Sequence, residues 1–248
     1  MEVSKVFATI PTYNEQENIL LLVKEIRSLL EGIEVVVADD DSPDRTWQTV
    51  MDLAQRDPGV HLLRRTEEKG RGRAGVDAFR YALAHGAELI IEMDGDFSHH
   101  PRHIPSLIHE ARAYDLVIGS RTIPGGVDSR NSWVRKAVTQ IANAYARWLL
   151  KLPVQDCNSG FRCFRRKVLE EIGLDSIVST GPSIVHEILY KAHRQGFSIK
   201  EVPIHFEERQ AGRSNLSLKK LLLSAWMVLK LRGMTGRFAA SSRSYLKE

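Results

Sequence analysis

The sequence predicts one α/β domain built on a mainly parallel, Rossmann-like sheet, followed by a carboxyl-terminal amphipathic helix. Short apolar runs alternate with helical patterns through the first half of the 248-residue chain, which is typical of βαβ units. The apolar runs are nearly continuous, as expected for strands buried on both faces of a sheet. No internal repeat or proline-rich linker divides the chain, so a single domain with a carboxyl-terminal arm is the simplest organisation.

The expected elements alternate regularly along the first half. Strands are expected at residues 6–10, 34–38, 60–63, 88–93 and 116–119. Helices are expected at residues 17–30, 47–55 and 74–84, and a further helix begins at Pro101 because proline suits the first helical turn. In open sheets of this kind, ligands bind beyond the carboxyl ends of the strands. The polar residues that follow each strand are therefore the candidate site.

The alternation weakens in the second half. Helices are expected at residues 133–150, 167–172 and 184–195, around a turn-rich segment at 153–162. We expect this half to form the acceptor side of a cleft. We divide the chain into a domain at residues 1–215 and an amphipathic helix with a tail at residues 216–248.

Composition limits the partners and the location. The net charge of +4 and the pI of about 9.1 favour an anionic partner such as a phosphate, a nucleotide or an acidic membrane. Cys157 and Cys163 are the two cysteines and lack zinc-type spacing, so we expect buried, reduced thiols. The amino terminus lacks a signal-peptide pattern, and three lysines interrupt the apolar stretch at 216–231. We therefore expect a cytoplasmic protein without a transmembrane helix.

The strongest chemical signal is Asp94-Gly95-Asp96, which directly follows the expected strand at 88–93. Carboxylate oxygens bind Mg²⁺ or Mn²⁺, and such an ion can bridge a diphosphate and neutralise the charge of the leaving group. Gly95 lets a ligand approach the backbone closely. An isolated triplet of this kind is usually a solvated turn, but two further strand ends, at residues 11–15 and 39–44, also carry polar groups. Their convergence favours a metal–nucleotide site.

The acidic run at residues 39–41 supports two interpretations that are compatible with each other. A carboxylate at this strand end can accept hydrogen bonds from a nucleobase or from ribose hydroxyls. Ser42 or Asp44 can instead cap the helix that follows. We expect Asp40 to bind a ligand and Asp44 to cap the helix.

Three other signals receive less weight. Residues 70–75 fit the pattern G-x-G-x-x-G but follow the third apolar strand, so we interpret them as a flexible loop before the helix at Ala74, not as a dinucleotide-binding turn. Adjacent His99 and His100 are expected to cap or line their loop. The basic residues at 64–65 and 69–73 lack a recognition motif, and the acidic strand ends would repel a polyanion, which argues against nucleic-acid binding.

The strand-end motifs resemble those of a known family. They are Pro11-Thr12-Tyr13-Asn14-Glu15-x-Glu17-Asn18, Asp39-Asp40-x-Ser42-Pro43-Asp44-x-Thr46 and Met93-Asp94-Gly95-Asp96-Phe97-Ser98-His99-His100-Pro101. They look like those of inverting glycosyltransferases of family 2, which adopt the GT-A fold. Residues 98–101, together with Gly119-Ser120-Arg121 and Ser159-Gly160-Phe161-Arg162, resemble the dolichyl-phosphate (polyprenyl-phosphate) mannosyltransferases. The resemblance covers roughly residues 6–231.

The resemblance implies a GT-A catalytic domain and a set of donor-site residues. The residues expected to hold the guanine and ribose of GDP-mannose are Pro11, Tyr13, Glu15, Ala38 and Asp40. Those expected to meet the diphosphate and the metal are Asp94, Gly95 and Asp96. Arg121 is expected at the sugar and phosphate end and Arg209 in a loop over the donor, because the guanidinium fork matches phosphate oxygens. The expected catalytic residues are Asp96, Arg121 and Arg209. Asn215, in the same donor loop, stands where many relatives have a lysine.

The implied acceptor is a dolichyl or polyprenyl monophosphate. Such a phosphate is already largely ionised near neutral pH and can attack the anomeric carbon without a catalytic base. Inversion then gives a β-linked mannosyl phosphate. We expect Arg121 and Arg135 to hold the acceptor phosphate, with Arg130 and Lys136 as further candidates. The alternative for Arg130, Arg135 and Lys136 is that they form a solvated, basic start of the helix at 133–150.

The carboxyl-terminal stretch at 216–231 has two interpretations. It either lies in a membrane interface, with Leu221, Leu222, Trp226 and Met227 entering the apolar boundary, or packs against the domain. We expect peripheral contact with the cytoplasmic face of a membrane, through this arm or through a membrane-anchoring subunit. The motifs do not fix the donor sugar, because relatives that transfer glucose or N-acetylglucosamine from UDP-sugars share them.

Overall fold

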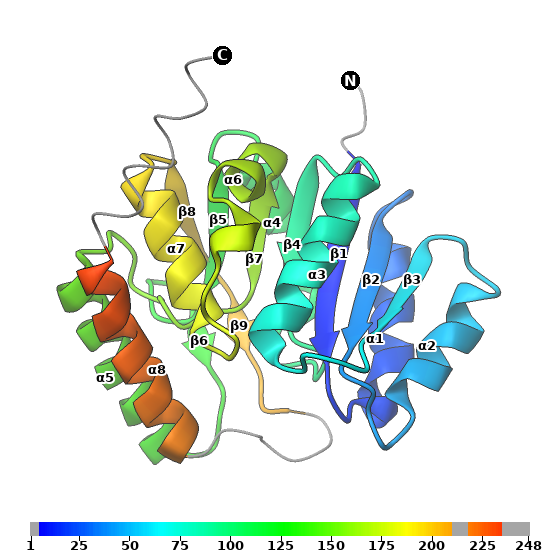
Figure 1. Ribbon diagram of the computed structural model, residues 1–248, viewed down its shortest axis with the longest axis horizontal. Coiled ribbons are helices and arrows are strands. Elements are labelled where there is room, and N and C mark those ends of the chain that lie inside the picture. The colour runs from blue at the N-terminus through cyan, green and yellow to red at the C-terminus, as the bar shows by residue number, and fades with distance from the viewer. Residues whose placement is uncertain (1–4, 210–217, 235–248) are drawn as a thin grey trace.

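A seven-stranded sheet forms the centre of the molecule within residues 5–209 and 218–234, which the computed structural model describes (Figure 1). Its strands are β1 (Val6–Thr12), β2 (Glu34–Asp39), β3 (Val60–Arg64), β4 (Leu89–Glu92), β5 (Leu116–Ser120), β7 (Arg162–Arg165) and β8 (Ile199–Pro203). They are ordered β3-β2-β1-β4-β7-β5-β8. Strand β7 runs antiparallel to both of its neighbours, and the other pairs are parallel. The predicted fold class is confirmed.

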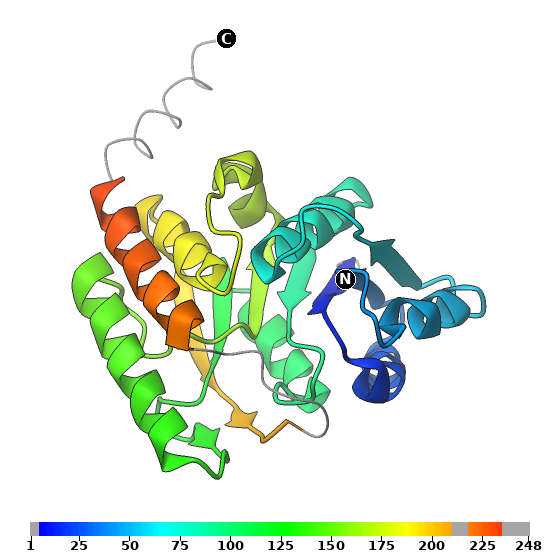
Figure 2. The ribbon, with the colours of Figure 1, turned by 60° about the horizontal axis from the view of Figure 1, so that its bottom comes forward.

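Helices cover both faces of this sheet. One face packs against α1 (Gln16–Leu29), α2 (Thr46–Ala54) and α4 (Ile104–Glu110), which follows η1 (Pro101–His103). The other packs against α3 (Arg71–Ala84), α6 (Arg166–Glu171) and α7 (Ile184–Arg194), with η2 (Leu174–Ser176) between the last two. A small second sheet pairs β6 (Val127–Asp128) with β9 (His205–Phe206). Helices α5 (Trp133–Leu150) and α8 (Leu218–Gly233) lie side by side on one flank (Figure 2).

Alternating side chains explain why the central strands are apolar along their whole length. In β1, Phe7 enters the core on the α3 side, whereas Ala8 and Ile10 enter the core on the α1 side. In β4, Ile90 and Ile91 divide in the same way. Full burial of a large apolar side chain contributes about 1.5–3 kcal/mol, so both faces of each central strand stabilise the fold.

Several features differ from the predictions, including strands β6, β8 and β9, which were not predicted. Helix α3 begins at Arg71, so the interpretation of residues 70–75 as a flexible loop was wrong. The glycines there allow close packing against residues 179–181, and this packing holds the segment in helical form. Strand β7 was not predicted, because it is only four residues long and carries arginine at both ends. Tertiary pairing with β4 and β5 decides its conformation.

Helix α8 packs against the domain through one face, as one of the two interpretations of the carboxyl-terminal arm predicts. Val228 and Leu231 are buried against the domain, and Tyr145 of α5 donates a hydrogen bond to the carbonyl of Ala225 at 3.1 Å. Leu222 and Trp226 are exposed on the other face, as the interface interpretation requires. Within the described part of the chain, no helix is long and apolar enough to cross a membrane. The predicted boundary at residues 215/216 lies outside the described residues.

The core assignment predicts a large loss of stability when Phe164 is replaced by alanine. Phe164 of β7 is fully buried and meets Phe79 of α3 edge to face, with ring centroids 5.5 Å apart. Phe164→Ala is expected to lower the free energy of unfolding by about 3–5 kcal/mol, measured by urea denaturation. The control Leu21→Ala, at a side chain that is 60% exposed on α1, is expected to change it by less than about 0.5 kcal/mol. Equal losses in both variants would contradict the assignment.

Candidate active site

The carboxyl ends of β1, β2 and β4 bring the predicted polar groups to one edge of the sheet. The three strands are adjacent and parallel, so their ends meet on the same side. Thr12 at the end of β1 is paired in register with Asp39 at the end of β2, and its hydroxyl donates to Asp39 Oδ2 at 2.8 Å. Asp39 is fully buried and also accepts from the amide of Ser42. Asp39 therefore stabilises the strand ends and does not face a ligand.

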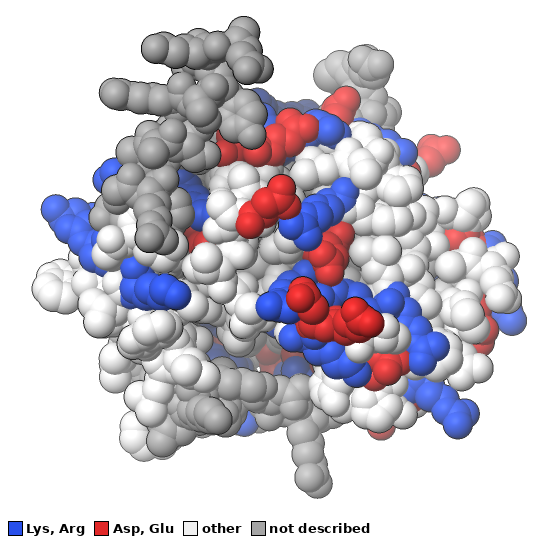
Figure 3. Space-filling model, in the orientation of Figure 1, with Lys and Arg blue, Asp and Glu red and all other residues white. Residues whose placement is uncertain are grey.

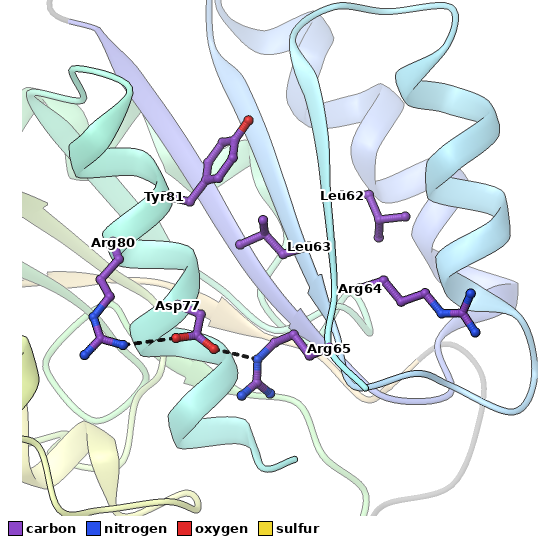
Figure 4. Close-up of a pocket in the computed structure, with 7 residues that line it drawn as sticks. All are labelled: Leu62, Leu63, Arg64, Arg65, Asp77, Arg80 and Tyr81. Atoms are coloured by element: carbon purple, nitrogen blue, oxygen red, sulfur yellow. Dashed lines mark hydrogen bonds and ion pairs between the residues drawn. The ribbon is translucent and has the colours of Figure 1, made fainter. Parts of the chain in front are cut away.

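Asp40 and Asp44 take the different positions that the sequence suggests. The Asp40 carboxylate is paired with Arg65 and accepts from the amide of Gly70 at 2.7 Å. Arg65 in turn donates to Asp77 of α3 at 2.8 Å (Figure 4). Asp44 accepts hydrogen bonds from amides at the first residues of α1 and α2, at 3.0 and 2.9 Å. The prediction that Asp44 satisfies free amide groups at a helix start is confirmed.

The other predicted nucleoside contacts differ in exposure. Tyr13 is 43% exposed, and Pro11 is partly exposed at the end of β1. Ala38 is fully buried in the core, so only its backbone can meet a ligand. Gly95 packs so closely that a Cβ there would lie 3.1 Å from the Thr12 side chain.

Arg209 joins two carboxylates from different strand ends. Its Nη1 lies 2.9 Å from Glu15 Oε1, and its Nη2 lies 2.9 Å from Asp96 Oδ2. Burial raises the pKa of Glu15, while hydrogen bonding from Asn18 and the charge of Arg209 act against this effect. Asp96 Oδ1 accepts from the amide of Ser98 at 3.0 Å. The predicted residues Glu15, Asp96 and Arg209 thus form one cluster.

Asp94 lies in a second cluster, beside the first. Its Oδ1 is 3.0 Å from Arg71 Nη2, and its Oδ2 is 3.5 Å from His99 Nδ1. Although burial acts in the opposite direction, the Arg71 guanidinium holds the pKa of Asp94 below its usual range. Arg71 Nη1 also lies 3.0 Å from Oε1 of Glu92, which is fully buried. Sequence reasoning missed Arg71 and Glu92, although a charged residue inside an apolar strand was a signal that Glu92 needs a partner.

The two adjacent histidines line and cap the loop as predicted. His99 is buried and stacks on Phe161, with ring centroids 5.2 Å apart. Its Nδ1 accepts from the amide of Asp94 at 3.2 Å, and burial lowers the pKa of His99. His100 caps η1 by accepting from the amide of Arg102 at 3.3 Å.

Arg121 is held by a carboxylate that the sequence did not reveal. Asp156, which is fully buried, accepts from Arg121 Nε at 2.9 Å and from Nη2 at 3.2 Å. The Arg121 guanidinium lies 4.5 Å from the centroid of the Phe206 ring, and that of Arg130 lies 5.4 Å from it. Arg121 and Arg130 therefore gather around β9.

Arg135 is not part of these clusters. Arg135 is half-exposed at the start of α5, with Nη1 3.6 Å from Oε1 of Glu208. Asn215 and Arg213 lie outside the described residues. No contact places Arg135 beside Asp94 or Asp96, so its link to the site runs through Glu208, the neighbour of Arg209 in sequence.

The donor set at the end of β4 fits a hard divalent cation that binds together with a diphosphate. Among the described residues, no group of three or more His, Cys, Asp and Glu side chains is arranged to hold a metal alone. Asp94 and Asp96 offer two carboxylates, and Mg²⁺ at nucleotide sites commonly uses one or two carboxylates plus phosphate oxygens and water. Arg209 already gives Asp96 a cationic partner, so this carboxylate is placed to accept positive charge.

A hollow beside α3 is lined by Arg65 on the side where Arg65 meets Asp77, and we do not count it as part of this site (Figure 4). Each guanidinium at the hollow is already paired with a carboxylate. Arg64 donates to Asp41, Arg65 to Asp77, and Arg80 to Asp175. The residues that line the hollow are Leu62, Leu63, Arg64, Arg65, Asp77, Arg80 and Tyr81.

Several characterised proteins are similar in sequence to this chain. Polyprenol monophosphomannose synthase from Mycolicibacterium smegmatis is 40% identical over 210 residues, which cover 84% of this chain and 79% of that protein. Undecaprenyl-phosphate mannosyltransferase from Micrococcus luteus is 39% identical over 213 residues, covering 86% and 88%. Dolichol-phosphate mannosyltransferase from Pyrococcus furiosus is 36% identical over 248 residues, covering 96% and 67%.

A solved structure supports the GT-A fold, and a family model shows which family the chain belongs to. Glucosyl-3-phosphoglycerate synthase from Mycobacterium tuberculosis, in complex with Mn²⁺, UDP and its product, superposes with a TM-score of 0.66 at 20% identity over 92% of this chain and 78% of that one. This likeness shows the expected GT-A fold. The model of glycosyl transferase family 2 matches residues 8–173. Because the match runs from β1 through the acidic strand ends to the end of α6, we conclude that this chain belongs to glycosyl transferase family 2, as its motifs predict.

Proposed function

We propose that the chain transfers mannose from GDP-mannose to a dolichyl or other polyprenyl monophosphate. The observation that carries the proposal is the pair of neighbouring clusters beyond the end of β4, Asp96 with Arg209 and Asp94 with Arg71, where two carboxylates and a guanidinium can serve one diphosphate. The similar proteins support the substrate class, since their names specify mannose transfer to polyprenol, undecaprenyl phosphate or dolichol phosphate. The product is a polyprenyl β-D-mannosyl phosphate, formed with inversion.

Each residue of the donor site has a role that its position allows. Asp94 and Asp96 would hold Mg²⁺ or Mn²⁺, which would supply neutralisation of charge on the diphosphate leaving group. Arg209 would donate to a phosphate oxygen, which its planar fork of donors suits. Asp40 and exposed Tyr13 receive the nucleoside. The chain's own contribution to rate is positioning and electrostatic stabilisation, because a phosphate nucleophile needs no base.

The acceptor phosphate is expected at Arg121. Asp156 takes Nε and Nη2 of Arg121, which leaves the Nη1 group of this guanidinium to donate to a phosphate. Phe206 lies against the same guanidinium and restricts its orientation. Arg135, at the start of α5, is placed to guide the incoming phosphate from the surface.

Transfer of radiolabelled sugar into organic-extractable polyprenyl phosphate tests this function. Metal-dependent labelling is expected from GDP-mannose and not from UDP-glucose or UDP-N-acetylglucosamine. Labelling from a UDP-sugar instead would retain the enzyme class and replace the donor. No labelling from any of the three donors with folded protein would contradict the proposal.

The same assay tests the metal site through Asp96→Asn. Removal of one carboxylate charge is expected to lower transfer at least about 100-fold, because metal stabilisation of the departing diphosphate contributes several kcal/mol. Asp52→Asn, at an exposed position on α2, serves as the control and is expected to retain activity. Full activity of Asp96→Asn would exclude Asp96 as a metal ligand.

The flank formed by α5 and α8 supports peripheral contact with a membrane. Neither helix contains Asp or Glu, and both carry exposed basic side chains, namely Arg135 and Arg147 on α5 and Lys230 and Arg232 on α8. Figure 3 shows mostly uncharged surface with scattered basic side chains on this side of the molecule. Aromatic and aliphatic side chains beside cations are typical of surfaces that bind the headgroup region of anionic bilayers. The large apolar side chains exposed on the two helices are Trp133, Val134, Val138, Ile141, Trp148, Leu222, Leu223, Trp226 and Leu229.

Sedimentation with phosphatidylglycerol-containing vesicles tests this surface. Trp148 is 77% exposed on α5 and Trp226 is 56% exposed on α8. The double variant Trp148→Ser, Trp226→Ser is expected to partition into the vesicles at least about tenfold less, because two large apolar groups no longer leave water. Met51→Ser, at an exposed position on α2, is the control. Unchanged partition of the double variant would exclude this flank as the contact surface.

A further inference from the structure

Residues 70–72 connect both ends of the donor site to the second half of the chain. The amide of Gly70 donates to Asp40 Oδ2 at 2.7 Å, at the nucleoside end. The guanidinium of Arg71 donates to Asp94 Oδ1 at 3.0 Å, at the diphosphate end. The amide of Gly72 donates to the carbonyl of Thr180 at 3.0 Å. A motif that resembles a dinucleotide-binding turn is therefore a bridge between parts of the candidate site.

The glycines are required by this contact. A Cβ at Gly70 would lie 2.6 Å from the carbonyl oxygen of Thr180, and one at Gly72 would lie 2.4 Å from that of Ser179. Gly70 also has a φ of 144°, which side-chain-bearing residues rarely adopt. The opposing segment is itself fixed, because buried Glu187 accepts from the amide of Ser179 at 2.8 Å. The start of α3, and with it Arg71, is thus held from both sides.

Arg71 bonds two carboxylates of very different exposure. Glu92 is completely buried in β4, whereas the side chain of Asp94 is 36% exposed. A buried carboxylate in a strand is costly unless it is paired, so Glu92 anchors the guanidinium strongly. The exposed member, Asp94, is the one expected to meet a ligand. The planar fork of arginine can hold both carboxylates at once, whereas a lysine ammonium is a point charge.

We propose that Arg71 is a positioning residue that, anchored on Glu92, fixes the Asp94 carboxylate in the orientation that receives a divalent cation with a nucleoside diphosphate. The inference rests on the proposed function for the identity of that ligand. Arg71 acts through Asp94 and takes no part in bond breaking. Residues that orient the ligands of a metal commonly change metal affinity 10- to 100-fold when they are replaced.

The informative variant removes the whole buried pair. Arg71→Leu alone would leave Glu92 buried without its partner and could prevent folding. The double variant Arg71→Leu, Glu92→Leu takes away the guanidinium and its anchor together and fills the space with apolar groups. Arg73→Gln is the matched control, because Arg73 lies two residues further along the same helix and pairs at 2.7 Å with Glu68, which is largely exposed.

The test is a titration of the full chain with Mn²⁺ in the presence of GDP, with bound Mn²⁺ measured by electron paramagnetic resonance. The double variant is expected to bind Mn²⁺ about tenfold more weakly while unfolding at a temperature close to that of the wild type, and Arg73→Gln is expected to bind as the wild type does. Arg71→Lys is expected to bind Mn²⁺ about as weakly as the double variant does, because a point charge does not fix both carboxylates.

Wild-type Mn²⁺ affinity in the folded double variant would overturn the proposal. Wild-type Mn²⁺ affinity in Arg71→Lys would also overturn the proposal, because a positive charge without the planar donors of a guanidinium would then be sufficient. The assay of sugar transfer by the wild type is independent of these variants. Transfer of mannose with unchanged Mn²⁺ affinity in the double variant would reject the role of Arg71 and leave the proposed function standing. Weakened Mn²⁺ binding by the double variant, together with no sugar transfer by the wild type from any donor, would support the role of Arg71 and reject the proposed function.

Discussion

The structure depends on how arginines compensate the negative charge gathered at the carboxyl ends of β1, β2 and β4. Parallel strands bring acidic side chains to one edge, where like charges repel and burial weakens solvation. Asp39 is satisfied by Thr12 and Ser42, and several other carboxylates are matched to a guanidinium from another part of the chain. The pairs are Asp40 with Arg65, Glu92 and Asp94 with Arg71, Glu15 and Asp96 with Arg209, and Asp156 with Arg121.

These arginines differ in how firmly they are held. Arg71 is anchored by a carboxylate that is completely buried, and Arg121 is held through two nitrogens by another. Arg209 bonds Glu15 and Asp96, whose side chains are nearly buried at 8% and 9% exposure. Under the proposed function, Asp96 would hold a divalent cation in place of Arg209, whose guanidinium would then be available to a phosphate. Arg71 and Arg121 would keep their carboxylate partners.

The same region connects the donor site to the proposed membrane surface. Strand β9 carries Phe206 beneath Arg121, and the chain continues through Glu208 to Arg209. Glu208 accepts from the amide of Asn131 at 2.9 Å, just before α5 begins. Helix α5 exposes Trp133 and Trp148 on the flank that it shares with α8. Under the proposed function, a lipid phosphate arriving along this flank would meet the sugar nucleotide near Arg209.

Much of the fold could be predicted from the sequence, and less of the site. The period of the apolar residues identified most helices and central strands, and the acidic strand ends located the candidate site because parallel strands must end together. Strand β7 and the helical start at Arg71 escaped prediction, since contacts with distant segments decide both. The partners of Arg71, Arg121 and Arg209 escaped for the same reason. Glu15 and Arg209 lie 194 residues apart, and no local sequence pattern predicts a contact between residues so far apart.

The most direct test of the account is the anomalous scattering of Mn²⁺ in crystals grown with Mn²⁺ and GDP. The account predicts one strong peak within bonding distance of Asp94 and Asp96, with the diphosphate beside it and Arg209 no longer on Asp96. A peak bound elsewhere, or GDP bound at this edge with Arg209 still on Asp96 and no peak, would contradict the claim that these strand ends form the metal–diphosphate site.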